Sequence, residues 1–268
     1  MSILLVLVYW CSRGGCMVER VAYIDVHSHL PEYSDADIER ILASIDVVIV
    51  SVGEDLESSI RSIEIAEKYK DRIYPCIGLH PWNVKSLREA LDEAKRIVDL
   101  ALSRNIKCLG EVGLDTKFVG ETIELQREVF RIFLEAARDY KLFLNLHTAG
   151  TWEEVFNLLI RYDIVAANFH WYTGPLHLLK DIESAGYTIS INPAVKIQAK
   201  HRNVVKAAPI SIMLTESDSP YKYRSLELEP RLVADAVAEI AAIKSVEASE
   251  VKKLVYENFR KKVLSVIG

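Results

Sequence analysis

Eight short apolar segments recur along the chain, and helical patterns separate many of them. The apolar segments are residues 23–30, 46–53, 73–80, 106–114, 143–148, 164–171, 187–193 and 210–218. Each is a run of the kind that forms a buried strand. Helical periodicity marks residues 56–69, 87–103, 121–140, 230–244 and 246–266, as the stripe of Leu125, Val129, Ile132 and Ala136 illustrates. Strands and helices therefore alternate along the chain.

Helix start signals agree with this division. Ser86, Thr151 and Thr173 stand where N-caps are expected, and Thr151 with Glu154 has the spacing of a capping box.

Eight strands alternating with helices predict the α/β class and a (β/α)8 TIM barrel. The main alternative is a doubly wound open sheet, which binds ligands at one crevice where the strand order reverses. That alternative gives no reason for functional residues to follow six different strands. No linker divides the chain, so we expect residues 17–268 to form a single barrel domain.

Composition narrows the class of protein. A chain of 268 residues with 50% hydrophobic content can bury a full core. The net charge of -5 argues against a broad basic surface for duplex nucleic acid, although a local patch is compatible with it.

The four cysteines show no CxxC pair. Cys76 and Cys108 lie in apolar strand-like runs, so we expect buried free thiols and a cytoplasmic location.

The first sixteen residues stand apart from the pattern. Residues 3–10 are apolar, but a membrane span takes about 20 residues, so no membrane association is expected. We expect residues 1–16 to be an extension or leader, with Met17 as the start of the protein.

Acidic and imidazole side chains follow the apolar segments repeatedly. Alternate side chains of a barrel strand face the interior, and catalytic groups collect at the C-terminal ends of the strands. Six strands direct such groups to one rim through His27 and His29, His80, Glu111, His147, His170 and Asp218.

A lone histidine is usually a polar loop residue or a satisfied core group, and His177 and His201 are interpreted in that way. The pair His27 and His29 differs, because two imidazoles on one strand face can reach a single ion.

Four imidazoles and two carboxylates exceed what one tetrahedral zinc site with an open position needs. They suffice for two divalent cations that share a carboxylate and a water. The surplus positive charge favours an anionic substrate such as a phosphodiester, with an activated water as nucleophile and a carboxylate as proton acceptor. Zinc, manganese and magnesium all remain open.

At these residues the chain resembles the TatD family of metal-dependent deoxyribonucleases, among the amidohydrolase-like barrels. The similarity runs from about residue 22 to the end. The matching pieces are Asp25-Val-His27-Ser-His29-Leu, Gly78-Leu-His80-Pro81, Gly110-Glu111-Val-Gly113-Leu-Asp115, Leu146-His147, His170 with Gly174, Glu216-Ser-Asp218-Ser-Pro220-Tyr221 and Val255-Tyr-Glu-Asn258.

The resemblance implies a role for each matching residue. His27, His29 and Asp218 would hold one ion, His147 and His170 the other, and Glu111 would bridge them. Asp218 would also accept the proton of the attacking water.

The remaining matches would act around the ions. The resemblance implies that His80 contacts the scissile phosphate and that Asp25, Asp115 and Glu216 orient the ligands. The alternative for the last three is that they satisfy hydrogen bonds inside the barrel.

Three departures from the family pattern concern the substrate. The family usually has an arginine soon after the strand-5 histidine, where this chain reads His147-Thr-Ala-Gly150. Residues 226–230 replace an RNEP-like segment, and Trp171-Tyr172 replaces small residues. Losing the arginine removes an expected phosphate contact.

Three functions are compatible with these residues. We favour a two-metal phosphodiesterase acting on DNA, with Trp171, Tyr172, Tyr221 and Tyr223 as candidates for base stacking or loop packing. The second is a hydrolase of small esters, amides, lactones or phosphoesters. The third is a non-catalytic metal-binding interaction barrel, which nothing in the sequence recommends because no ligand position has been lost. The oligomeric state stays open.

Overall fold

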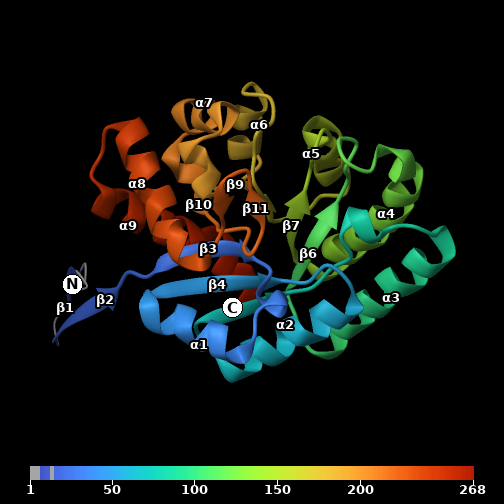
Figure 1. Cartoon of the computed structure of the whole chain (residues 1–268), viewed down its shortest axis with the longest axis horizontal. Coiled ribbons are helices and arrows are strands. Elements are labelled where there is room, and N and C mark those ends of the chain that lie inside the picture. The colour runs from blue at the N-terminus through green and yellow to red at the C-terminus, as the bar shows by residue number, and fades with distance from the viewer. Residues whose placement is uncertain (1–6, 13–14) are drawn as a thin grey trace.

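Eight parallel strands, β3 to β10, form the centre of the molecule, and helices surround them (Figure 1). The computed structural model describes residues 7–12 and 15–268. The strands are β1 (Leu7–Ser12), β2 (Gly15–Arg20), β3 (Tyr23–Ser28), β4 (Val47–Val52), β5 (Ile73–Cys76), β6 (Cys108–Gly113), β7 (Phe143–His147), β8 (Ala167–Phe169), β9 (Thr188–Ile191), β10 (Met213–Thr215), β11 (Lys222–Tyr223) and β12 (Leu226–Glu227).

The eight central strands follow one another in the order of a barrel. Strands β3 to β5 make one parallel sheet and β6 to β10 another. At the first seam Ile77 N donates to Cys108 O at 3.1 Å, and Gly110 N donates to Ile77 O at 2.9 Å. At the second seam, Asp218 N donates to His27 O at 2.9 Å. These bonds link the two sheets in sequence order, as the predicted (β/α)8 barrel requires.

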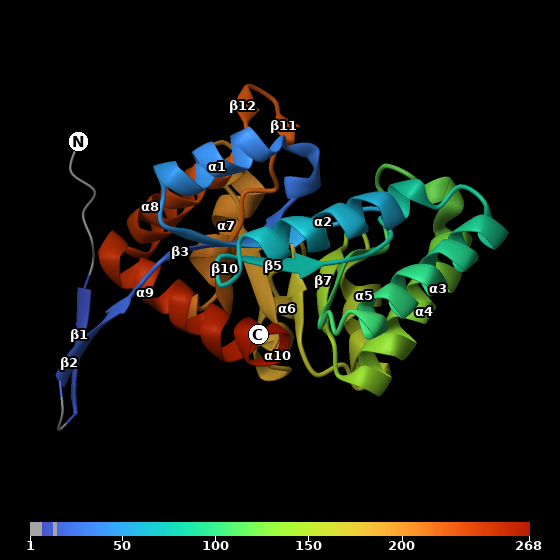
Figure 2. The ribbon, with the colours of Figure 1, turned by 90° about the horizontal axis from the view of Figure 1, so that it is seen from below.

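The helices cover the strands from outside (Figure 2). They are α1 (Asp35–Ser44), α2 (Leu56–Lys68), α3 (Leu87–Ser103), α4 (Ile123–Tyr140), α5 (Trp152–Arg161), α6 (Leu178–Ser184), α7 (Ala199–Ala207), α8 (Val233–Lys244), α9 (Ala248–Phe259) and α10 (Ser265–Ile267). The five predicted helical patterns all form helices. No helical pattern was predicted for α1, α5, α6 and α7, which have seven to ten residues each, although the cap at Thr151 indicated the start of α5.

The predicted caps were only partly right. Ser86 and Thr151 do precede α3 and α5, but neither side chain makes a capping hydrogen bond. The capping box is wrong because Glu154 instead pairs with Arg127, at 2.7 Å. Thr173 is also wrong as a cap, since α6 begins at Leu178. Gly174 and Pro175 follow Thr173, and a proline disfavours helical backbone at the residue before it, so no helix begins there.

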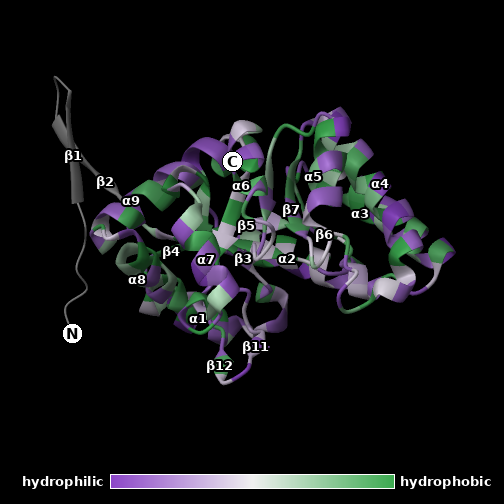
Figure 3. Cartoon of the chain, turned by 90° about the horizontal axis from the view of Figure 1, so that it is seen from above, coloured by the Kyte–Doolittle hydropathy of each residue, from purple (hydrophilic) through white to green (hydrophobic). Residues whose placement is uncertain are grey.

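The core lies between the strands and the inner helix faces. Figure 3 shows apolar and polar faces alternating around the outer helices. Phe130, Phe133 and Phe143 are among the largest fully buried side chains, and they fill the space where α4 packs on the strands. Apolar residues spaced three and four apart on α4 account for that packing.

The structure corrects the prediction of free thiols. Cys76 and Cys108 are buried as predicted, but they form a disulfide with their Cα atoms 4.5 Å apart. The two cysteines lie on β5 and β6, which the barrel places side by side although 32 residues separate the pair in sequence. Because Cys76 and Cys108 are not free thiols, they do not support the prediction of a reducing, cytoplasmic compartment.

Strands β1 and β2 pair as an antiparallel hairpin before the barrel. The interpretation of residues 1–16 as an extension stays a prediction, because residues 1–6 and 13–14 lie outside the described residues. Within the part of the chain that is described, no helix has the length and apolar character of a membrane span.

Candidate metal centre

The predicted site residues converge on one cavity at the C-terminal ends of the strands. The cavity has a volume of about 260 Å³, and His29, His80, Glu111, His147, His170 and Asp218 line it. His27 lies beneath them and is fully buried. Barrel geometry explains the convergence, because every parallel strand ends at the same rim.

Glu111 on β6 is the centre of the cluster. Its Oε2 atom lies 3.2 Å from His27 Nε2 and 3.6 Å from His29 Nε2. Its Oε1 atom lies 2.7 Å from His147 Nδ1 and 3.0 Å from His170 Nε2. Oε2 thus faces the two histidines of β3, and Oε1 faces His147 and His170, with His80 Nε2 also 3.4 Å from it.

Asp218 closes the side of the cluster that holds the β3 histidines. Its Oδ1 atom lies 3.4 Å from His29 Nε2 and 3.6 Å from His27 Nε2. Its backbone has φ of 54°, in the left-handed region that non-glycine residues rarely adopt. A carboxylate in such a conformation at a buried site is typical of functional positions.

Hydrogen bonds fix the ring orientation of two histidines. His27 Nδ1 lies 3.2 Å from Asn145 Oδ1, and His147 Nε2 lies 3.0 Å from Asp115 Oδ2. A carboxylate or amide oxygen can only accept, so each of these nitrogens carries the proton. The opposite nitrogen of each ring faces Glu111, and it is the nitrogen that would bind a cation on losing its proton.

Glu216 and Asp25 support the centre less directly. Glu216 Oε1 accepts from the backbone of Trp171 at 2.7 Å and lies 3.7 Å from His170 Nδ1. Asp25 Oδ1 accepts from the backbone of Ser217 at 2.7 Å. Asp25 therefore links β3 to the segment that carries Asp218. Among the described residues, no hydrogen bond joins the Asp25 carboxylate to a histidine ring.

His80 differs from the other imidazoles in its protonation. Its Nδ1 accepts a hydrogen bond from the backbone N–H of Trp82 at 3.2 Å. A neutral ring in that arrangement carries its proton on Nε2, which lies 3.1 Å from His147 Nδ1 and 3.4 Å from Glu111 Oε1. Burial lowers the pKa of His80 to about 4, which keeps the ring neutral. His80 thus presents a hydrogen-bond donor to the cavity.

His29 and His170 are held toward the charged form. Burial opposes protonation of His29, but the carboxylates of Asp218 and Glu111 outweigh it and raise its pKa to about 9. Burial likewise opposes charge on His170, yet Glu111 and Glu216 raise its pKa well above the ordinary value. Burial also raises the pKa of Glu111, but the imidazoles around it bring the pKa well below its usual range. The ionised carboxylates, together with imidazoles that release their protons on metal binding, provide the charge and the donor atoms that suit divalent cations.

Donor atoms within 4.8 Å of one another define several groups that fit a cation. They are His27 with His29 and Glu111, His27 with His170 and Asp218, and His80 with Glu111 and His147. Because the proton on His80 occupies the nitrogen facing the cavity, the third group fits a cation less well than the first two. A further group joins His29 to Glu32 and Glu54 at the cavity mouth.

His177 and His201 do not line the cavity. His177 is exposed and pairs with Glu153 at 2.9 Å. His201 on α7 is fully buried, and neither of its ring nitrogens has a hydrogen-bond partner in the described structure. Among the candidates for stacking, Tyr172 is wrong, because its ring is fully buried beneath the loop and its hydroxyl donates to Pro175 O at 2.7 Å.

Asn145 and Trp82 had no predicted role in the site. Asn145 shares an inward strand face with His147, two residues away, and that spacing was the available signal. Trp82 Nε1 donates to Asp115 Oδ2 at 2.6 Å. Since 33 residues separate Trp82 from Asp115, no local pattern reveals the contact.

Comparison with known proteins identifies the family of the chain. The family model described as TatD related DNase matches residues 24–263. An uncharacterized metal-dependent hydrolase of Methanocaldococcus jannaschii is 32% identical over 245 residues, covering 89% of this chain and 95% of its own. Human deoxyribonuclease TATDN3 is 27% identical, covering 89% of this chain and 93% of its own.

Solved structures show the same fold. YjjV, a TatD homologue of Escherichia coli, superposes with a TM-score of 0.76 at 23% identity, covering 88% of this chain and 96% of its own. A TatD-family hydrolase of Entamoeba histolytica gives a TM-score of 0.77 at 20% identity, covering 90% and 97%. Fold, site geometry and the family match across most of the sequence agree, and the chain belongs to the family of TatD-related DNases.

Proposed function

We propose that this protein hydrolyses phosphodiester bonds of DNA at a centre of two divalent cations. The observation that carries the proposal is the position of Glu111, whose Oε2 faces His27 and His29 and whose Oε1 faces His147 and His170. A carboxylate between two donor sets is the arrangement that a bridging ligand needs. His27, His29 and Asp218 would hold one ion, and His147 and His170 the other. When bound, the ions would polarise the phosphoryl group and lower the pKa of a coordinated water.

The residues around this centre have separable tasks. Asp218 Oδ1 faces the cavity and is held ionised, because the imidazoles of His29, His170 and His27 lower its pKa despite burial. It would accept the proton of the attacking water. His80, neutral with its proton on Nε2, would donate a hydrogen bond to a non-bridging oxygen of the phosphate.

The test is cleavage of single- and double-stranded DNA by protein supplied with Mg²⁺, Mn²⁺ or Zn²⁺. His147→Ala removes one imidazole from the centre and should abolish the activity. If the wild-type protein cleaves no more DNA than this variant with any of the three metals, the proposal is wrong.

A second candidate is a hydrolase of small phosphoesters or esters. It is favoured by the cavity of about 260 Å³ and by the carboxylates of Glu32 and Glu54 at its mouth, which repel a long polyanion. Turnover of p-nitrophenyl esters or phosphoesters without cleavage of DNA would select this candidate.

A further inference from the structure

Five aromatic side chains form two groups around the mouth of the cavity. In the first group, the rings of Trp82 and Phe118 pack edge to face with centroids 5.6 Å apart. In the second, Trp171 packs against Tyr221 at 5.9 Å and Tyr223 at 5.2 Å. Phe118 is 56% exposed and Tyr221 is 44% exposed, so these rings do not serve mainly as core.

Each aromatic group adjoins a different part of the metal centre. The ring of Trp82 lies 5.2 Å from His80 and 6.3 Å from His147. Trp171 directly follows His170 in the chain. The backbone N–H of Tyr221 donates to Asp218 O at 3.1 Å. The reacting groups therefore have an aromatic wall next to His80 and another next to Asp218.

The second wall is held in a fixed orientation. Trp171 Nε1 donates to Gln198 Oε1 at 2.9 Å, and the Trp171 backbone N–H donates to Glu216. Its backbone φ of 40° is in the left-handed region, and its side chain lines the cavity. Rigid aromatic rings bind flat ligands with little loss of side-chain freedom.

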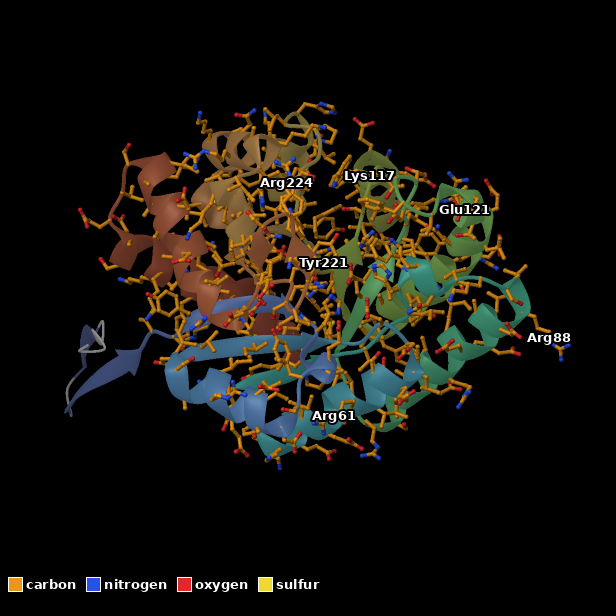
Figure 4. All side chains as sticks on the ribbon, viewed as in Figure 1. Arg61, Arg88, Lys117, Glu121, Tyr221 and Arg224 are labelled. Atoms are coloured by element: carbon orange, nitrogen blue, oxygen red, sulfur yellow. A yellow bond between two sulfur atoms is a disulfide. The ribbon has the colours of Figure 1, made fainter. Side chains whose placement is uncertain are left out.

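A positively charged side chain lies beside each aromatic wall. Lys117 Nζ lies 4.8 Å from the ring centre of Phe118, and the Arg224 guanidinium lies 5.4 Å from that of Tyr223. Neither has a carboxylate at ion-pair distance within the described residues. Figure 4 shows Tyr221 near the middle of the view with Lys117 and Arg224 above it, whereas Arg61 and Arg88 lie toward the edges. Glu32 and Glu54 are the opposing charges at the mouth.

We propose that the two walls are base-binding subsites, one for each nucleoside that flanks the scissile phosphate, and that Lys117 and Arg224 bind the neighbouring phosphates. This rests on the phosphodiesterase function proposed above. Stacking suits unpaired nucleotides, because base faces inside a duplex are covered. The Lys117 and Arg224 side chains would supply the phosphate contact that an arginine would otherwise make, since Thr148 and Ala149 follow His147 in this chain.

Two phosphodiesters with the same leaving group test the stacking. They are thymidine 5′-(p-nitrophenyl phosphate) and methyl p-nitrophenyl phosphate, and the ratio of their kcat/KM values isolates the contribution of one nucleoside. Since stacking on an aromatic side chain changes binding by roughly 5- to 150-fold per base, the wild-type ratio should exceed about ten. Phe118→Ala combined with Tyr223→Ala should lower the ratio about tenfold. The control Tyr140→Ala removes an exposed ring on α4, outside the cavity, and should leave the ratio unchanged.

The roles of Lys117 and Arg224 are tested by measuring kcat/KM for a thymidine octanucleotide at several salt concentrations. Lys117→Met and Arg224→Met should each lower kcat/KM and reduce the salt slope by about 0.7 for the lost phosphate contact. Lys180→Met, an exposed lysine of α6, is the control and should change neither quantity.

The outcomes separate this inference from the proposed function. Equal kcat/KM for the two p-nitrophenyl substrates would overturn the subsites and leave the phosphodiesterase intact. If neither substrate is hydrolysed, the proposed function fails, and anisotropy with fluorescein-labelled tetrathymidylate then tests the subsites directly. Equal binding by the wild type and the Phe118/Tyr223 double variant would overturn them.

Discussion

Asp115 provides the sharpest test of how the metal centre is held in place. Its carboxylate accepts four hydrogen bonds and faces only donors. Its Oδ2 accepts from Trp82 Nε1 at 2.6 Å and from His147 Nε2 at 3.0 Å. Its Oδ1 accepts from the backbone N–H groups of Lys117 at 2.7 Å and Phe118 at 2.8 Å. A carboxylate satisfies all four, whereas an amide of the same shape must turn its NH2 group toward one pair.

Asp115→Asn should therefore weaken the hold on His147 with little change in packing. Burial raises the pKa of Asp115, but its bonds to His147 and Trp82 prevail and lower it to about 2, so the wild-type group is ionised at neutral pH. Removing an acceptor behind a metal-bound histidine typically costs 10- to 100-fold in metal affinity, or about 1.4–2.7 kcal/mol. We expect a loss of this size at the ion held by His147 and His170, and a smaller one at the other ion.

Calorimetric titration of metal-free protein with Zn²⁺, in competition with a chelator, measures both affinities. The control Asp99→Asn changes an exposed carboxylate on α3 and should bind both ions as the wild type does. Thermal unfolding of the metal-free variants checks that the fold is kept. Wild-type affinity for both ions in a folded Asp115→Asn protein would refute this account of His147.

Three further predictions concern other parts of the site and fold. Asp218→Asn should lower kcat on a p-nitrophenyl phosphodiester by roughly 10²- to 10⁴-fold through loss of the proton acceptor, and a metal-loaded variant with wild-type kcat would exclude that role. Gly113→Ala should cost about 3 kcal/mol or more in urea unfolding, because its φ is 148° and a Cβ atom would lie 2.0 Å from His147 O; unchanged stability would contradict the geometry. Burial lowers the pKa of His201 to about 3, so only the unfolded chain binds this proton between pH 6.5 and pH 3. The free energy of unfolding should therefore fall by about 1.4 kcal/mol per pH unit as the pH drops through that window, and His201→Gln should remove this contribution to the slope, which parallel urea titrations would detect.

The sequence was sufficient to predict the barrel because each strand and helix carries its own periodic signal. Apolar runs such as 143–148 and stripes such as that of Leu125 and Val129 are local patterns, and strict alternation of strands and helices leaves few topologies. The short helices α1, α6 and α7 escaped because seven to ten residues give little periodicity to detect.

The convergence of the six predicted ligands also followed from sequence. Their positions at strand ends are a local property, and a barrel brings all strand ends to one rim. What their rings contact could not be predicted in the same way. The partners Asn145 and Asp115 lie 118 and 32 residues from His27 and His147.

The sequence by itself thus determined the fold class and the residue types at the rim, since both depend on short-range patterns. Only the tertiary structure decided that Cys76 and Cys108 form a disulfide, because strand pairing across 32 residues brings them together. It also decided that His80 presents a proton, since the backbone of Trp82 occupies its other nitrogen. Tyr172 and Trp171 are adjacent in sequence, yet one is buried and the other lines the cavity. These differences depend on which segments the closed barrel places side by side, and local sequence does not encode them.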